Sequence, residues 1–182
     1  MHLTKKKSKN LNIVAISLYD LGHQPLPLAA AAAIFKKHSC DFSLIDLSIS
    51  NLNEDEITAA DIILISVPMH TAARMALNIL PTLKELNPDA HISAFGLYAI
   101  QLEDSLSEHY LDSAFAGEFE PNLELLLQEY IKGNNSLVSS KTWEKLRTDF
   151  TRQKFFVPER KKLPNLNEYA KIQYRDNEKI NG

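Results

Sequence analysis

Short apolar runs alternate with longer amphipathic stretches over the first 131 residues of the chain. Five runs have the length and apolar content of buried strands, namely Leu11–Leu18, Asp41–Leu47, Asp61–Val67, His91–Phe95 and Ser113–Ala116. Parallel strands have this near-continuous apolar character because both of their faces are covered. Strands that alternate with helices through short loops predict right-handed crossovers and a mostly parallel sheet with helices on both faces.

Helical spacing of apolar residues fills the intervals between these runs. The predicted helices are Pro27–Lys37, a short acidic one at Asn53–Ala60, Thr71–Leu86 with Thr71 as its cap, Leu102–His109 and Pro121–Ile131. The third of them contains Pro81, which removes one backbone hydrogen bond. We therefore predict a kink or a brief break there, and not two separate helices.

The pattern as a whole predicts an α/β fold with a doubly wound, five-stranded parallel sheet in the flavodoxin-like or Rossmann-like order 2-1-3-4-5. The order 3-2-1-4-5 is the alternative, and the presence of only five strands favours the former. We expect this domain to span residues 11–132, after a flexible N-terminal tail at 1–10. Residues 133–182 are interpreted as a linker and an extended tail, with a helix at 141–150 and a strand at Lys171–Tyr174.

Composition narrows the classes of partner and location. The formal net charge is -3, which argues against a nucleic-acid-binding footprint over the domain. The longest apolar stretch, Leu26–Phe35, is too short to span a bilayer, and no signal core follows the first ten residues. We therefore expect no nucleic acid and no membrane among the partners, and a cytoplasmic protein. The single cysteine, Cys40, supplies neither an iron–sulfur cluster nor a four-thiolate zinc site in this chain.

Candidate chemistry gathers in the loops that follow strands one, three, four and five. Ligands of open parallel sheets bind beyond the carboxyl ends of the strands, where the strand order reverses. These loops hold three of the five glycines and two of the six histidines of the chain. The candidate binding residues are Tyr19, Asp20, Gly22, His23, Ser66, Pro68, Met69, His70, Thr71, Gly96, Leu97, Tyr98, Gly117 and Glu118.

Several familiar α/β chemistries lack their motifs in these loops. The first turn has neither G-x-G-x-x-G nor G-x-x-x-x-G-K-[ST], and no G-x-S-x-G is present. Ser66 stands where a phosphoacceptor domain would need an aspartate. His23 and His70 are either ligand-facing imidazoles or ordinary loop histidines. Asp20, and Glu118 with Glu120, are candidate acid–base groups. Alternatively, Glu118 and Glu120 place negative charge at the start of the last helix.

Three of the loops resemble the N-terminal cobalamin-binding-type domain of radical SAM proteins. The segments that carry the resemblance are Ser66–Thr71, Ala94–Ala99 and Gly117–Pro121, the last being similar to a Gly-Glu-Gly-Glu stretch of that family. The turn Tyr19–Pro25 resembles a subgroup whose C-terminus carries a Cys-or-selenocysteine, Cys-Ala-Glu-Pro-like tail. Leu163–Tyr169 resembles the linker that leads into the radical SAM barrel. The resemblance implies a cobalamin site on these loops and a catalytic barrel that is absent from residues 1–182.

Two departures from the family pattern qualify what the resemblance implies. Cobalamin domains that ligate cobalt carry Asp-x-His-x-x-Gly, whereas this chain has Asp20-Leu21-Gly22-His23. We therefore expect cobalamin, if bound, without a protein histidine on cobalt. Leu97 stands in place of the second glycine of a Gly-Gly pair, where its side chain is expected to crowd the nucleotide tail.

Three functions follow from these observations. The first is a cobalamin-binding module, truncated before the barrel and without turnover of its own. The second is a degenerate scaffold domain that acts through domain–domain contacts or self-association. The third is a small hydrolase or transferase that uses His23, His70 and Asp20. The expected partner is the missing barrel, or a second copy of the chain, at the rim with Tyr98 and Phe119 and through the tail.

Overall fold

A five-stranded parallel sheet forms the centre of the molecule. The computed structural model describes residues 10–102, 110–133, 156–173 and 179–181. The strands of the sheet are β1 (Asn12–Ser17), β2 (Asp41–Asp46), β3 (Ile62–Ser66), β4 (His91–Phe95) and β5 (Ser113–Phe115). They lie in the order β2-β1-β3-β4-β5, and every neighbouring pair is parallel. The predicted fold class and strand order are confirmed, and the order 3-2-1-4-5 is wrong.

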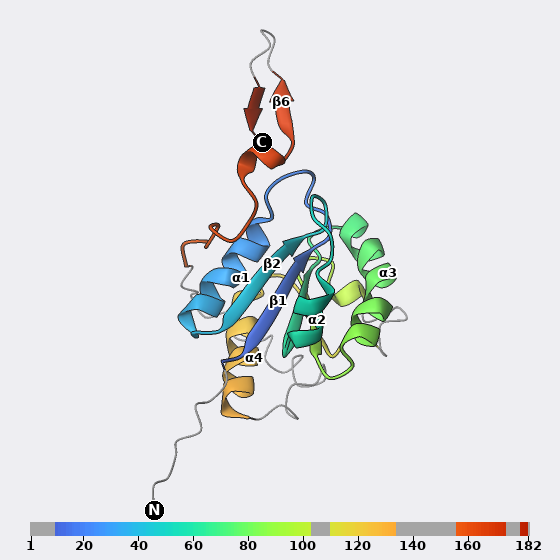
Figure 1. Ribbon diagram of the computed structural model, residues 1–182, viewed down its shortest axis with the longest axis vertical. Helices are drawn as coiled ribbons and strands as arrows, with labels where there is room; N and C mark the ends of the chain where they lie inside the picture. The colour runs from blue at the N-terminus through green and yellow to red at the C-terminus, as the bar shows by residue number, and fades with distance from the viewer. Residues whose placement is uncertain (1–9, 103–109, 134–155, 174–178, 182) are drawn as a thin grey trace, which may run out of the picture.

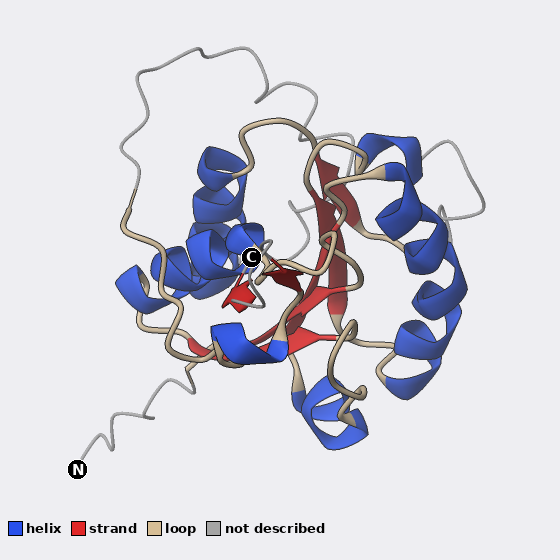
Figure 2. Cartoon of the chain, turned by 90° about the horizontal axis from the view of Figure 1, so that it is seen from above, coloured by secondary structure: helices blue, strands red, loops and turns tan. Residues whose placement is uncertain are grey.

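Helices cover both faces of the sheet, as Figures 1 and 2 show. One face packs against α1 (Leu26–Lys37) and α4 (Glu120–Lys132), and the other against α2 (Glu54–Ala59) and α3 (His70–Leu86). Successive side chains of a strand point to opposite faces, so β1 supplies Ile13 and Ala15 to the first layer and Val14 and Ile16 to the second. Both faces are apolar for this reason, which explains the continuous apolar runs of the sequence.

The helix boundaries correct one prediction and refine others. Thr71 is not the cap of α3, because the extended backbone of Met69 (φ -150°, ψ 167°) starts the helix at His70 and places Thr71 inside its first turn. The helix runs unbroken through Pro81, so the expectation of one element holds. α4 has Pro121 in its first turn and ends at Gly133, whose φ of 80° is left-handed. Leu102 is the only described residue of the helix predicted at 102–109, and it is the last residue of a 3₁₀ turn, η1 (Ile100–Leu102).

The last described segments lie against the sheet domain and then leave it. Residues 156–170 run along α1 and over the β1–α1 loop, with a 3₁₀ turn, η4, at Leu166–Glu168. A two-stranded antiparallel hairpin follows, formed by β6 (Lys171–Gln173) and β7 (Lys179–Asn181). It projects beyond the carboxyl ends of β1 and β2 (Figure 1). The predicted helix at 141–150 lies outside the described residues, and so does Tyr174.

None of the helices in the described ranges combines the length and the apolar character needed to cross a membrane.

Candidate functional site

A single row of side chains crosses the carboxyl edge of the sheet. The strand register pairs Ser17 of β1 with Asp46 of β2 and with Ser66 of β3, and pairs Ser66 with Phe95 of β4. Alternation along each strand directs these side chains to the face of α1 and α4, where Phe95 and Phe115 join the core. The row is therefore polar over β2, β1 and β3 and aromatic over β4 and β5.

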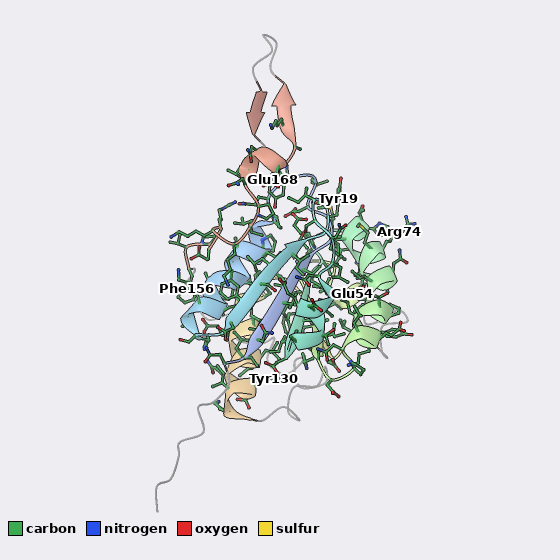
Figure 3. The ribbon with its side chains drawn as sticks, viewed as in Figure 1. Tyr19, Glu54, Arg74, Tyr130, Phe156 and Glu168 are labelled. Atoms are coloured by element: carbon green, nitrogen blue, oxygen red, sulfur yellow. The ribbon has the colours of Figure 1, made fainter. Side chains whose placement is uncertain are left out.

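The loops above this row bring the candidate residues to one end of the sheet, seen from above in Figure 2. Figure 3 labels Tyr19 and Glu168 at this end, and Tyr130 at the opposite end. The strand order reverses between β1 and β3, so the β1–α1 and β3–α3 loops flank the switch point. The candidate residues differ in exposure. Six are exposed at the rim, namely His23, His70, Thr71, Leu97, Gly117 and Glu118. Seven are half-buried, namely Tyr19, Asp20, Gly22, Pro68, Met69, Gly96 and Tyr98, and Ser66 is buried.

The rim glycines have different reasons to be glycine. Gly96 has φ +112°, and a Cβ there would lie 2.9 Å from the carbonyl oxygen of Val67, so the β4 loop packs directly on the β3 loop. Gly22 has φ +78°, and a Cβ there would lie 2.9 Å from the Cβ of Ala170. Gly117 has φ +68°, and a Cβ there would meet no atom within 4 Å. Of these three glycines, Gly117 alone leaves its backbone open to an incoming molecule.

Aromatic side chains fill the interior beneath β4 and β5. The rings of Phe95 and Phe119 lie 4.6 Å apart between centroids, and both side chains are buried. Leu97, which we expected to crowd the nucleotide tail of a bound cobalamin, is 69% exposed and lies at the surface of the rim. The space beneath the loops of β4 and β5 is therefore filled by Phe95 and Phe119. The comparison of Leu97 with the second glycine of the family's Gly-Gly pair did not identify these two residues.

An apolar groove leads away from the rim between the first turns of α1 and α4. It has a volume of about 430 Å³ and is lined by Leu26, Pro27, Ala30, Ile34, Phe119, Glu120, Phe156 and Pro158. Leu26 at its mouth is 49% exposed. Figure 3 places Phe156 on the outer side of α1, where the last described segments begin to follow that helix. The groove gives the rim an apolar extension on the α1 and α4 face.

The acidic side chains of the site lie around the start of the β1–α1 loop. Burial raises the pKa of Asp20, the nearby His23 opposes this rise, and Asp46 adds to it. The structure thus brings Asp20, His23 and Asp46 together, whereas His70 starts α3 on the other face of the sheet. No group of three or more His, Cys, Asp or Glu side chains in the described part of the chain is arranged to hold a metal ion.

Three buried polar groups were missed by reasoning from the sequence. Ser17 and Asp46 are each 1% exposed and Tyr169 is 5% exposed. The Ser17 Oγ, the Asp46 Oδ2 and the Tyr169 hydroxyl have no hydrogen-bond partner of good geometry among the described residues. A polar residue that closes an otherwise apolar strand, as in NIVAIS and DFSLID, was the available signal.

Comparisons with known proteins support the fold. No protein-family model and no curated protein matches the sequence. Among solved structures, the radical S-adenosylmethionine methyltransferase TsrM from Kitasatospora setae, determined with cobalamin and an iron–sulfur cluster, is similar at a TM-score of 0.57 and 12% identity. The match covers 69% of this chain and 25% of TsrM. A flavodoxin from the domain Archaea is similar at a TM-score of 0.47 and 16% identity, over 68% of this chain and 98% of that one.

The chain thus spans only a quarter of the cobalamin-bound protein that it resembles. At 12% identity the likeness to TsrM shows the fold alone, an α/β domain with a parallel sheet in the flavodoxin-like order.

Proposed function

We propose that this chain is the cobalamin-binding-type module of a cytoplasmic radical SAM protein, and that it presents the cofactor to a separate catalytic barrel without turnover of its own. The observation that carries the proposal is the rim at the carboxyl edge, where a half-buried Met69 lies at the strand-order switch and an exposed Leu97 and an open Gly117 follow the neighbouring strands β4 and β5. TsrM, which has a domain of this fold, was determined with cobalamin bound.

The rim fits a flat, largely apolar ring with polar edges. Met69, Leu97 and Tyr98 offer apolar surface, and Gly117 allows close approach of the backbone. A ligand part that extends past the ring would enter the apolar groove between α1 and α4, since Phe95 and Phe119 fill the interior. When bound, the cobalt would supply group-transfer chemistry, and these residues would hold and orient the ring.

The cobalt would lack a histidine from this chain. His23 lies beside Asp20 at an exposed turn, and its spacing differs from the motif that ligates cobalt. His70 is exposed in the first turn of α3. Both imidazoles are therefore better placed to contact the edge of a ligand than its centre.

A ligand held mainly by phosphate is disfavoured at this edge. Anions commonly bind the free N–H groups at a helix N-terminus. At α1 two of the relevant positions, Pro25 and Pro27, have no N–H, and the carboxyl groups of Asp20 and Asp46 lie nearby. This arrangement disfavours a phosphate at the start of α1, so a bound cobalamin would keep the phosphate of its nucleotide tail away from this position.

A scaffold domain without a cofactor is the second candidate. The observation that favours it is the coverage of the β1–α1 loop by residues 156–170, which reduces the open part of the edge. The domain would then act through contacts of its rim and tail with the barrel or with a second copy of the chain.

Binding of hydroxocobalamin tests the first proposal directly. The full chain is mixed with the cofactor, free cofactor is removed by gel filtration, and the visible spectrum is recorded. Leu97→Asp should weaken binding by about 10-fold or more, because burying a leucine side chain is worth roughly 1.5–3 kcal/mol. Ile131→Asp is the matched control, since Ile131 is also an exposed aliphatic residue, 56% exposed, but lies beside Tyr130 at the other end of the domain.

Retained colour that is lost in Leu97→Asp and kept in Ile131→Asp supports the module. No retained colour in any variant supports the scaffold. Equal retention of colour in both variants would place the binding site away from Leu97.

A further inference from the structure

Residues 156–170, here called the strap, cross the β1–α1 loop and close the polar half of the carboxyl edge. The first half of the strap is firmly attached. Its Glu159 N–H donates to the Ala29 carbonyl at 2.8 Å, and the Glu159 carboxylate pairs with Lys36 at 2.6 Å. The buried Gln24 uses both ends of its amide on the strap, donating to the Pro164 carbonyl at 2.9 Å and accepting from Arg160.

Apolar and cationic contacts add to the attachment of this first half. Leu163 is 7% exposed and belongs to the core on the α1 and α4 face. Lys162 donates to the Phe42 carbonyl at 2.6 Å and lies 3.8 Å from the centre of the Phe42 ring. A cation above an aromatic ring is attracted by the ring, more weakly at an exposed site such as Lys162 than at a buried one. The strap is therefore anchored as far as Pro164.

The second half of the strap is held differently. Residues 165–168 form a compact turn, in which Asn165 and Glu168 cap each other reciprocally. Beyond this turn, one backbone hydrogen bond reaches the sheet domain, from the Ala170 N–H to the Gly22 carbonyl at 2.9 Å. Tyr169 alone among the last three residues of the strap is buried.

Tyr169 occupies a polar subsite that it satisfies poorly. Burial, then the negative charge of Asp46 and a side-chain hydrogen bond of poor geometry to it, raise the pKa of its hydroxyl, which places the hydroxyl beside that carboxylate. The two groups nevertheless lack good hydrogen-bond geometry, and the Ser17 Oγ is also unpartnered within the described ranges. Asp46 Oδ1, by contrast, accepts from the N–H and the hydroxyl of Ser48 at 3.1 and 2.7 Å. A buried polar group that is left unpaired is destabilising, so a better donor has an advantage over the tyrosine.

We propose that residues 165–170 are an internal substitute for a ligand: Tyr169 fills a subsite lined by Ser17 and Asp46, and a neutral or cationic ligand that donates hydrogen bonds displaces it. The carboxylate of Asp46 accepts hydrogen bonds and repels anions, and Asp20 adds a second carboxyl group close by. Amides, hydroxyls and ammonium groups meet these requirements. Displacement turns residues 165–170 about Pro164 and carries the β6–β7 hairpin with them, so that ligand binding reorients whatever contacts the hairpin.

The inference rests on the proposed function only for the choice of probe, hydroxocobalamin, whose ring carries primary amides. Amide hydrogen exchange on the full chain reads out displacement at two matched positions. Binding should speed exchange of the Ala170 amide, which bonds to Gly22 in the second half of the strap. The Glu159 amide, which bonds to Ala29 in the anchored half, should stay protected.

Affinity gives a second readout. Tyr169→Ala removes the competing side chain and should tighten hydroxocobalamin binding by about tenfold. Leu166→Ala is the matched control, because Leu166 lies in the same turn and is 46% exposed. Binding by the wild type with an unchanged Ala170 amide and an unchanged or weaker Tyr169→Ala would overturn the inference while leaving the proposed function intact.

Absence of cobalamin binding in every variant would count against the proposed function, and a second probe then decides the inference. Tyr169→Gly leaves a space shaped like a phenol, and p-cresol supplies the missing ring and hydroxyl. Stabilisation of Tyr169→Gly by p-cresol, with none for Leu166→Gly, supports a subsite that accepts an external donor. No stabilisation of Tyr169→Gly shows that the strap is an ordinary part of the fold.

Discussion

Replacing Gly96 by alanine should destabilise the fold far more than the same change at Gly117. Both glycines follow a strand of the sheet, and both have positive φ, +112° and +68° respectively. A Cβ at Gly96 would lie 2.9 Å from the carbonyl oxygen and 3.0 Å from the carbonyl carbon of Val67, whereas a Cβ at Gly117 would meet nothing within 4 Å. The pair separates the cost of a left-handed conformation from the cost of a collision with backbone.

The magnitudes follow from these two terms. A residue other than glycine in a left-handed conformation costs roughly 1–2 kcal/mol, and Gly117→Ala should lose only this. Val67 cannot easily move away from Gly96, because its N–H donates to the Phe95 carbonyl at 2.7 Å and its carbonyl accepts from the Tyr98 N–H at 3.0 Å. Forcing a methyl group into packed structure adds about 1–3 kcal/mol, so Gly96→Ala should lose about 2–5 kcal/mol in total.

Urea unfolding followed by circular dichroism measures both losses as changes in the extrapolated free energy of unfolding. The slope with urea should match the wild type in both variants, so that the midpoint carries the difference. Equal losses at Gly96 and Gly117, or a larger loss at Gly117, would refute the close approach of the β3 and β4 loops on which the shape of the rim depends.

Two further predictions concern the sheet domain away from the rim. Asn87→Ala should cost about 2–4 kcal/mol by urea unfolding, because it removes the buried amide that donates to the Ile57 and Ala60 carbonyls at 2.8 and 2.9 Å. The exposed Asn78→Ala on α3 should change little. Burial lowers the pKa of His91 from 6.5 to about 4. The folded chain then binds fewer protons than the unfolded chain between these values, so stability should fall as the pH drops through this window, and His91→Gln should show a smaller fall between pH 7 and pH 5. A steeper pH dependence in His91→Gln would contradict this assignment.

Local sequence determined the five strands, their parallel arrangement and the layers of helices. Apolar runs and helical periodicity are short-range properties, and right-handed crossovers leave few arrangements for them. The sequence also predicted that the candidate loops gather at the carboxyl edge of the sheet, because the loops that follow parallel strands share one edge. The sequence did not predict the start of α3 correctly, because the helix begins after the extended backbone of Met69 and is not capped by the hydroxyl of Thr71.

Tertiary structure alone decided what the carboxyl edge contains. Asp46 is distant in sequence from Tyr169, and only the folded chain brings the two side chains together. Gln24 and Pro164 likewise meet across 140 residues of chain. Contacts at such separations depend on the path of the whole backbone, and no periodicity of the sequence records them. Whether a polar side chain at a strand end faces solvent, a ligand or another part of its own chain was therefore settled by packing.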